Sequence, residues 1–161
     1  MKQLYLVRHG KSSWDYNVAD RNRPLQERGI NDALLVAKHL KSNFIQPDIV
    51  FSSPANRALH TCTIFMNSLG IPLSKLQVNE QLYDFEGRAV GDFIKALDNA
   101  FSNVMIFGHN HAFTAISNIF GSETIDNLPT AGVVKINFEV QNWEDITSGN
   151  TELIIFPKQL K

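Results

Sequence analysis

Short apolar runs, separated by apolar residues at helical spacing, constrain the fold of this chain more than any other feature. The runs are Leu4–Val7, Asp48–Phe51 and Val104–Phe107. Continuous runs of this length are typical of strands that are buried on both faces of a parallel sheet. The sequence therefore predicts one buried strand at each run, and these three strands should be parallel and central.

Four stripes of apolar residues at helical spacing lie between and after these runs. They extend from Ile30 to Leu40, Ala58 to Leu69, Phe93 to Phe101 and Phe113 to Phe120. Near the end of the chain, residues 132–140 and 153–156 are strand-like and flank a turn-rich segment, which predicts a hairpin. Together, the pattern predicts an α/β fold: a three-layer αβα sandwich with a mostly parallel central sheet and a late antiparallel addition.

Length and composition indicate one folded domain that spans residues 1–161. A chain of 161 residues can bury a single sizeable core, and no internal repeat, low-complexity tract or linker divides this one. The content of 43% hydrophobic residues is too high for a disordered chain.

The charge balance excludes partners that are held by a general electrostatic field. With 15 basic and 16 acidic residues, the net charge is -1, so we expect neither nucleic-acid nor membrane binding. The single cysteine, Cys62, cannot form an internal disulfide. The chain begins without the apolar core of a signal peptide, and no segment approaches the length of a membrane span. We therefore expect a cytoplasmic protein.

Segments with arginine, histidine or serine follow each of the three predicted central strands. They are Arg8-His9-Gly10, then Ser52-Ser53 with Arg57 shortly after, and Gly108-His109-Asn110. Because parallel strands end at the same edge of a sheet, we expect two arginines and two histidines to meet there. Guanidinium groups suit a tetrahedral oxyanion such as phosphate, and a neutral imidazole can attack phosphorus. The pattern predicts phosphoryl transfer through a phosphohistidine.

A metal or other cofactor is not expected at this edge. The chain has no thiolate pair, no HExxH motif and no comparable ligand spacing, although His109 and His111 lie close together in sequence. His111 could border the pocket or simply begin a helix.

The chain resembles the histidine phosphatase superfamily, and most of all its small phosphohistidine phosphatase (SixA-like) branch. The resemblance covers nearly the whole chain, through the blocks 6–14, 23–29, 52–61, 108–110 and 130–132, with Trp143 and Pro157. It implies a phosphoglycerate-mutase-like fold with His9 as the phosphate-accepting nucleophile. It also implies that Arg8 and Arg57 clamp the phosphoryl oxygens and that His109 adds charge on the far side. The branch often has alanine at Gly10 and proline at His111.

Glu80 is the candidate proton donor. The segment Asn79-Glu80-Gln81-Leu82-Tyr83 resembles the Asn-Glu-x-x-Tyr segment of phosphoglycerate-mutase-like relatives, where the acidic residue has this role. A carboxyl group near phosphate needs a raised pKa to keep its proton. Asp84 or Glu86 could take the role instead, and a phosphohistidine substrate needs no strong acid, since its imidazole leaving group can carry a proton.

The leading hypothesis is a metal-independent phosphatase for phosphohistidine on a protein, such as a signalling phosphotransfer domain. Little chain is left for lids, so we expect an open pocket. The alternatives are a phosphatase or mutase for small phosphomonoesters, and a non-catalytic phosphate-binding module. Arg23 and Trp14 follow the branch pattern and could border the pocket, or could form a helix-start ion pair and a packed surface aromatic.

Overall fold

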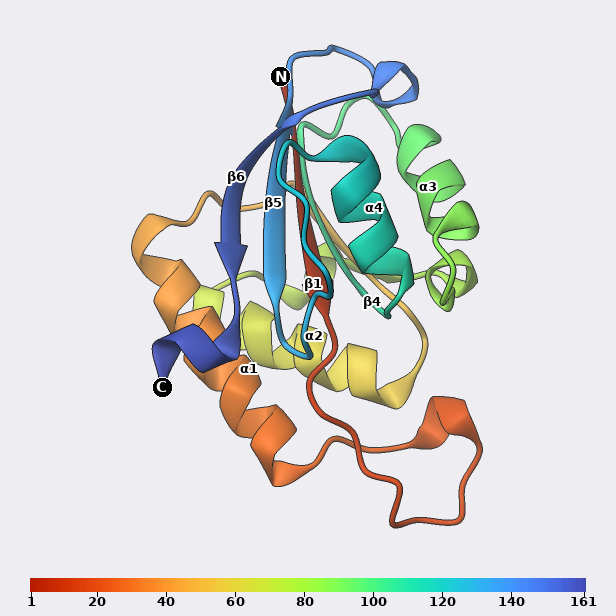
Figure 1. Cartoon of the computed structure of the whole chain (residues 1–161), viewed down its shortest axis with the longest axis vertical. Helices are drawn as coiled ribbons and strands as arrows, with labels where there is room; N and C mark the ends of the chain where they lie inside the picture. Colours follow the sequence, from red (N-terminus) through yellow and green to blue (C-terminus); the bar gives the residue numbers. More distant parts are fainter.

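A six-stranded sheet runs through the middle of the molecule, with two helices against each face (Figure 1). The computed structural model describes residues 1–161. The strands are β1 (Lys2–Arg8), β2 (Ile49–Ser52), β3 (Leu76–Val78), β4 (Asn103–Gly108), β5 (Val133–Phe138) and β6 (Asn150–Ile155). Their order is β3-β2-β4-β1-β5-β6. The first four in this order are parallel, whereas β5 pairs antiparallel with β1, and β6 pairs antiparallel with β5. The predicted three-layer α/β fold, with its antiparallel addition, is confirmed.

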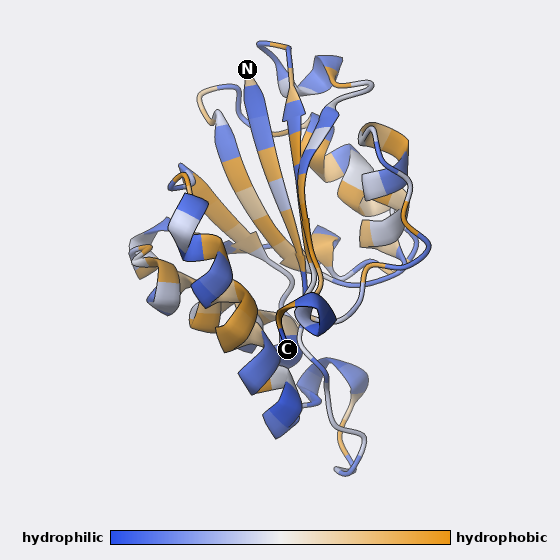
Figure 2. Cartoon of the chain, turned by 60° about the vertical axis from the view of Figure 1, so that its left-hand side comes forward, coloured by the Kyte–Doolittle hydropathy of each residue, from blue (hydrophilic) through white to orange (hydrophobic).

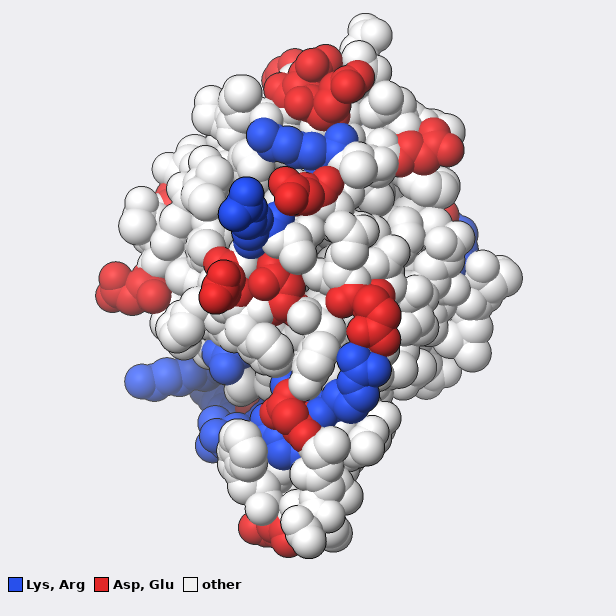
Figure 3. All heavy atoms as spheres, turned by 90° about the vertical axis from the view of Figure 1, so that its right-hand side faces the viewer, with Lys and Arg blue, Asp and Glu red and all other residues white.

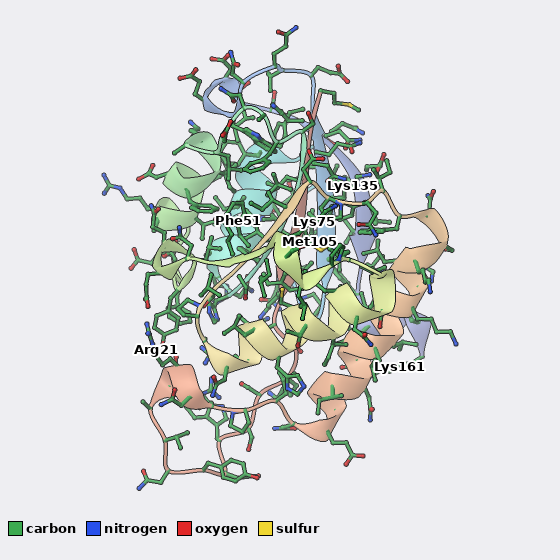
Figure 4. The ribbon with its side chains drawn as sticks, turned by 180° about the vertical axis from the view of Figure 1, so that it is seen from behind. Arg21, Phe51, Lys75, Met105, Lys135 and Lys161 are labelled. Carbon is green, nitrogen blue, oxygen red and sulfur yellow. The ribbon has the colours of Figure 1, made fainter.

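The four longer helices cover the two faces in pairs. They are α1 (Glu27–Leu40), α2 (Asn56–Leu69), α3 (Arg88–Lys95) and α4 (Ala112–Phe120). Side chains alternate along each strand, so Leu4 and Leu6 of β1 pack towards α3 and α4, while Tyr5 and Val7 pack towards α1 and α2. Figure 2 shows the resulting apolar strands between the two helical layers. Phe51 and Met105, labelled in Figure 4, belong to opposite sides of this core.

Three of the predicted helical stripes are wrong in detail, including that of α4, where Ile119 is 64% exposed. The helix α3 ends at Lys95, before Leu97 and Phe101, because the chain turns at Asp98, whose carboxylate accepts a hydrogen bond from the Ala100 N–H. In α1, Leu34 is 45% exposed, since Val36 rather than Leu34 shares the buried face with Ala37. The predicted stripe of α2 is buried throughout.

Two short 3₁₀ segments lie beyond the carboxyl ends of the parallel strands. They are η1 (Asp20–Asn22), in the connection from β1 to α1, and η4 (Glu80–Leu82), which follows β3. The long connection that carries η1 projects away from the sheet (Figure 1, lower right). Side chains of the two segments are bonded to each other, so this edge is partly covered. None of the helices has the length and apolar character that a membrane crossing requires.

Candidate active site

Backbone hydrogen bonds hold the ends of the three central strands in one frame. The His9 N–H donates to the Gly108 carbonyl at 3.0 Å, and the Ser53 N–H donates to the Phe107 carbonyl at 3.0 Å. On the other side of β1, the Ala131 N–H donates to the carbonyls of Arg8 and His9. The first residues after β1, β2 and β4 are therefore fixed relative to one another, although they are far apart in sequence.

Two glycines allow the loop after β1 to pack directly on the start of α1. A Cβ atom at Gly10 would lie 2.7 Å from the Gly29 carbonyl oxygen, and one at Gly29 would lie 2.2 Å from the Lys11 carbonyl oxygen. Neither position has room for a side chain unless the backbone moves. The Gly10 N–H donates to Thr61 Oγ1 at 2.9 Å, which ties the same loop to α2.

His9 and His109 face each other at this edge, with ring centroids 5.2 Å apart. His9 Nδ1 lies 2.7 Å from the Gly10 carbonyl oxygen. Because a carbonyl only accepts hydrogen bonds, this contact places the ring hydrogen on Nδ1 and leaves a lone pair on Nε2. An imidazole held in this way presents Nε2 as a nucleophile.

Both rings are buried and neutral at pH 7. His9 is 7% exposed and His109 is fully buried. Burial, together with the charges of Arg57, Arg8 and Arg23, lowers the pKa of His9 to about 3 despite the opposing Gly10 hydrogen bond. Burial, followed by the proximity of His9 and Arg57, lowers the pKa of His109 to about 2. In place of the expected positive charge, His109 can offer an anion a neutral ring N–H.

Three guanidinium groups surround the two rings, and all of them influence the pKa of His9. Arg8 donates from Nη1 to the Leu128 carbonyl at 2.8 Å. Arg23, which is 7% exposed, donates to Ser12 Oγ and to Asp20. Among these arginines and histidines, three buried side-chain nitrogens have no hydrogen-bond partner: Arg8 Nε, Arg57 Nε and His109 Nδ1. Unused donors of this kind are costly to bury, and an oxyanion would satisfy them.

Asp20 is bonded to Arg57 at this edge. Arg57 donates from Nη1 to the Asp20 carbonyl oxygen at 2.7 Å and from Nη2 to Asp20 Oδ2 at 3.0 Å. Tyr83 donates its hydroxyl hydrogen to the same carboxylate oxygen. Burial alone would raise the pKa of Asp20, but these hydrogen bonds and the charge of Arg57 bring it down to about 2. With Arg8, Arg23 and Arg57, one ionised Asp20 leaves two net positive charges.

The expected open pocket is therefore not what the structure shows. His9 and His109 are 7% and 0% exposed, Tyr83 packs on His109, and its hydroxyl group donates to Asp20. The terminal nitrogens of Arg57 need acceptors, and the segment before α1 is long enough to supply them from Asp20. In Figure 3, Lys and Arg side chains gather in the lower part of the molecule, with acidic side chains among them.

Glu80 does not have the environment expected of a proton donor. Its carboxylate accepts two hydrogen bonds from Arg21, at 3.1 and 2.8 Å, and its side chain is 70% exposed. The Arg21 hydrogen bonds lower the pKa of Glu80, whereas a proton donor needs a raised one. Arg21 itself lies on η1 at the outer edge of the molecule, away from the core (Figure 4).

Asp84 and Glu86, the two alternative candidates for the proton donor, lie in different surroundings from Glu80. Asp84 accepts hydrogen bonds from the N–H groups of Glu86, Gly87 and Val90, which places its carboxylate at the start of α3. Glu86 is exposed. His111 is also exposed and immediately precedes α4, so the structure places it at the helix start.

Aromatic side chains border the site on two sides. The Arg23 guanidinium stacks on Trp14, 3.5 Å from the ring centroid, and Trp14 is 73% exposed. Phe85, also exposed, packs on His109 with ring centroids 4.9 Å apart. Tyr83 packs on His109 as well, at 5.4 Å. The ring of His109 is thus held between aromatic neighbours and the strand ends.

Sequence reasoning assigned no role to Asp20, Thr61 or Phe85. Thr61 and Ser53 lie within motif blocks, but their contacts with Gly10 and His109 depend on how α2 and β4 meet β1. Asp20 had one weak signal, namely that two predicted phosphate-binding arginines need counter-charges in the free protein. No residue spacing could identify which carboxylate supplies that charge.

Comparison with known proteins agrees with this geometry. Residues 4–78 match the sequence model of the histidine phosphatase superfamily (branch 1). The uncharacterized protein Rv1276c of Mycobacterium tuberculosis is 29% identical over 163 residues, which cover 93% of this chain and 98% of that protein. A 2,3-bisphosphoglycerate-dependent phosphoglycerate mutase of Methylorubrum extorquens is 37% identical over 70 residues, or 42% of this chain and 33% of the mutase.

A similar fold is found in a solved structure with a bound oxyanion. The protein histidine phosphatase SixA complexed with tungstate superposes with a TM-score of 0.82 at 25% identity, and 99% of each chain is covered. The sequence match and this structural similarity both point to the histidine phosphatase superfamily.

Proposed function

We propose that this chain is a member of the histidine phosphatase superfamily and a phosphatase that removes phosphoryl groups from phosphohistidine on a protein. His9 takes the phosphoryl group from the substrate in a first chemical step and releases it to water in a second. One observation supports this substrate above others: the pKa of Asp20, which is bonded to Arg57 at the site, is lowered to about 2, and the pKa of the candidate donor Glu80 is lowered as well. The leaving group must then depart without a strong acid from the enzyme.

Binding of the phosphoryl group uses the donors that have no partner in the free protein. Arg8 Nε, Arg57 Nε and His109 Nδ1 are buried and unbonded, and the site carries two net positive charges from its three arginines and Asp20. A phosphoryl dianion matches both the charge and the need for hydrogen-bond acceptors. Arg8 and Arg57 are thus the proposed clamp, and His109 the third contact.

The first chemical step forms a bond between His9 Nε2 and phosphorus as the bond from phosphorus to the leaving nitrogen breaks. The Gly10 carbonyl holds His9 Nδ1–H and so keeps the Nε2 lone pair available. When the leaving group is an imidazole that already carries a proton on its other nitrogen, the departing nitrogen keeps the electron pair of the broken bond, and the ring leaves as neutral imidazole without an acid from the enzyme. In the second step, water attacks phosphorus, inorganic phosphate leaves and His9 Nε2 regains its lone pair.

The surface around the site suits a protein substrate. Trp14, Tyr16 and Val18, on the segment that carries η1, are 73%, 62% and 46% exposed. Exposed apolar side chains next to a reaction site are typical of surfaces that contact another protein. The partner we propose is a histidine-phosphorylated protein, such as a signalling phosphotransfer domain.

A second candidate is a phosphatase or mutase for small phosphomonoesters. It is favoured by the position of Tyr83, whose hydroxyl group binds Asp20 at the site, and by the matching stretch of the phosphoglycerate mutase. A non-catalytic phosphate-binding module would use the same arginines but would leave His9 Nε2 without a chemical role.

A substrate panel tests the proposal. Hydrolysis of a histidine-phosphorylated phosphotransfer protein, of a sugar phosphate and of an aryl phosphate is compared for the wild type, with His9→Gln as the background and with EDTA present. The proposal expects the largest kcat/KM for the phosphoprotein. Equal or better hydrolysis of the sugar phosphate would favour the second candidate, and phosphate binding without turnover would favour the binding module.

The role of the exposed segment is tested on the same panel. We expect the double variant Tyr16→Ala with Val18→Ala to raise KM for the phosphoprotein severalfold and to leave aryl phosphate hydrolysis unchanged. Leu73→Ala is a matched control, because Leu73 is 65% exposed and lies before β3, at the opposite end of the parallel strands. Equal effects of the two changes would remove the argument for a protein substrate.

A further inference from the structure

Ser53 makes a buried contact with His109 that has no place in the steps described so far. The Ser53 side chain is fully buried, and its Oγ lies 2.8 Å from His109 Nε2. The same oxygen accepts a hydrogen bond from the Ala55 N–H at 3.2 Å. Ser53 is itself fixed, because its N–H donates to Phe107 at the end of β4.

The hydrogen on Ser53 Oγ has one acceptor within reach, which is His109 Nε2. If the hydroxyl group donates to Nε2, that nitrogen carries a lone pair, and the single hydrogen of the neutral ring is on Nδ1. If instead Nε2 carried the hydrogen, the Ser53 oxygen would accept from both Nε2 and Ala55, and its own hydrogen would be buried without a partner. In the first arrangement, the Ser53 hydroxyl hydrogen, His109 Nε2 and the Ala55 N–H each have a hydrogen-bond partner.

We infer that Ser53 is a positioning residue that holds His109 as the Nδ1–H tautomer, so that its buried and otherwise unpartnered Nδ1 donates to the phosphoryl group. This inference rests on the proposed function for the identity of the acceptor, but the tautomer itself does not depend on turnover. The opposite tautomer would present a lone pair to the phosphoryl oxygens, and the contact would be repulsive.

The surroundings of His109 prevent a ring flip that would move Nε2 away from Ser53. Tyr83 and Phe85 pack on it with ring centroids 5.4 and 4.9 Å away, and His9 lies 5.2 Å away. A ring that is held on three sides keeps the orientation that places Nε2 against Ser53. The tautomer is then set by the hydroxyl group alone.

The inference is tested first by spectroscopy of the ligand-free enzyme. Long-range ¹H–¹⁵N correlation spectra distinguish a protonated ring nitrogen from an unprotonated one, and the His109 signals are identified by their loss in His109→Gln. In the wild type, we expect the hydrogen on Nδ1 and a lone pair on Nε2. A hydrogen on Nε2 in the wild type overturns the inference, whether or not any variant folds.

Variants then test whether the hydroxyl group is responsible. Ser53→Ala should convert His109 wholly or partly to the Nε2–H tautomer, and Ser53→Thr, which keeps a hydroxyl group, should restore the wild-type signals. Ser52→Ala is the matched control, because Ser52 is equally buried and its hydroxyl group donates to the Ser53 carbonyl rather than to His109. Unchanged His109 signals in Ser53→Ala would overturn the inference.

Kinetics connect the tautomer with the reaction. We expect Ser53→Ala to lower kcat by about 10- to 100-fold with a smaller change in KM, since a donor to developing charge contributes mainly in the transition state. Ser53→Thr should recover most of the loss, and Ser52→Ala should keep the wild-type rate. Wild-type kcat in Ser53→Ala overturns the inference even if phosphatase activity is confirmed, whereas a wild type without turnover but with the expected tautomer contradicts only the proposed function.

Discussion

At the scale of single residues, the two histidines differ in which ring nitrogen has no hydrogen-bond partner. The Gly10 carbonyl takes the Nδ1 hydrogen of His9, which leaves Nε2 as a nucleophile. The Ser53 hydroxyl group lies at Nε2 of His109, which leaves Nδ1 as the free atom. Two chemically identical side chains therefore take different roles because of one hydrogen bond each.

The role of Glu80 yields a prediction at this scale. Because its carboxylate is ionised, exposed and paired with Arg21, Glu80→Gln should leave kcat for a phosphohistidine protein within about threefold of the wild type. The same measurement on Asp84→Asn controls for damage to α3, since Asp84 bonds three N–H groups there. A loss of 100-fold or more in Glu80→Gln alone would restore Glu80 as the proton donor.

The sequence was sufficient to predict which side chains follow the strands, but not what they touch. The positions of Arg8, His9 and His109 follow from apolar runs that end at one sheet edge. The pairing of Arg57 with Asp20 could not be predicted, because it joins α2 to an irregular segment whose path no periodicity specifies. The environment of Glu80 was misjudged for the same reason, since Arg21 reaches it from that segment.

At the scale of elements, the loop after β1 depends on its contact with the start of α1. Gly10 and Gly29 meet backbone to backbone, and the Ser12–Leu25 bridge continues the contact. The hydrogen bonds that orient His9 and fix Gly10 come from this same loop. The position of the nucleophile is thus linked to the packing of a helix.

This contact predicts that Gly10→Ala destabilises this chain, although alanine is frequent at the position in the branch that it resembles. The added Cβ would lie 2.7 Å from the Gly29 carbonyl oxygen, and we expect a loss of about 1–3 kcal/mol in the free energy of unfolding. Urea unfolding measures it. Gly91→Ala, within α3, is the control, because its Cβ would meet Ile116 at an ordinary 3.5 Å and should be neutral or stabilising. Equal stability of Gly10→Ala and the wild type would contradict the account.

The elements themselves were predicted well where burial is complete and poorly where it is partial. The strands β1, β2 and β4, and the buried face of α2, follow directly from apolar patterns. The end of α3 was placed too late, because Leu97 remains buried after the helix has ended, and an apolar pattern cannot separate helix from buried loop.

At the scale of the whole molecule, the buried neutral histidines beside clustered arginines make the folded chain less stable in acid. The pKa values of His9 and His109, about 3 and about 2, lie far below the ordinary value near 6.5. Between the lowered pKa values of the folded chain and the ordinary value near 6.5, the unfolded chain binds more protons than the folded one. The free energy of unfolding therefore falls as the pH decreases below about 6.5.

Urea unfolding from pH 7.5 to 5.0, in a buffer without phosphate, measures this effect. We expect each histidine to account for a loss of about 2 kcal/mol between pH 6.5 and 5. The double variant His9→Gln with His109→Gln should show a much flatter pH dependence, whereas His60→Gln, at an exposed position in α2, should follow the wild type. A wild-type profile as flat as that of the double variant would show that the two histidines are not buried and neutral.

The central claim is that His9 carries the phosphoryl group, and rapid-quench labelling tests it most directly. The enzyme is mixed with a ³²P-labelled phosphohistidine protein, quenched within milliseconds, and the label on the enzyme is challenged with acid and alkali. We expect label that is labile in acid and stable in alkali, absent from His9→Gln and present in Glu80→Gln. Acid-stable label, or turnover by His9→Gln near the wild-type rate, would contradict a phosphohistidine intermediate and leave direct attack by water.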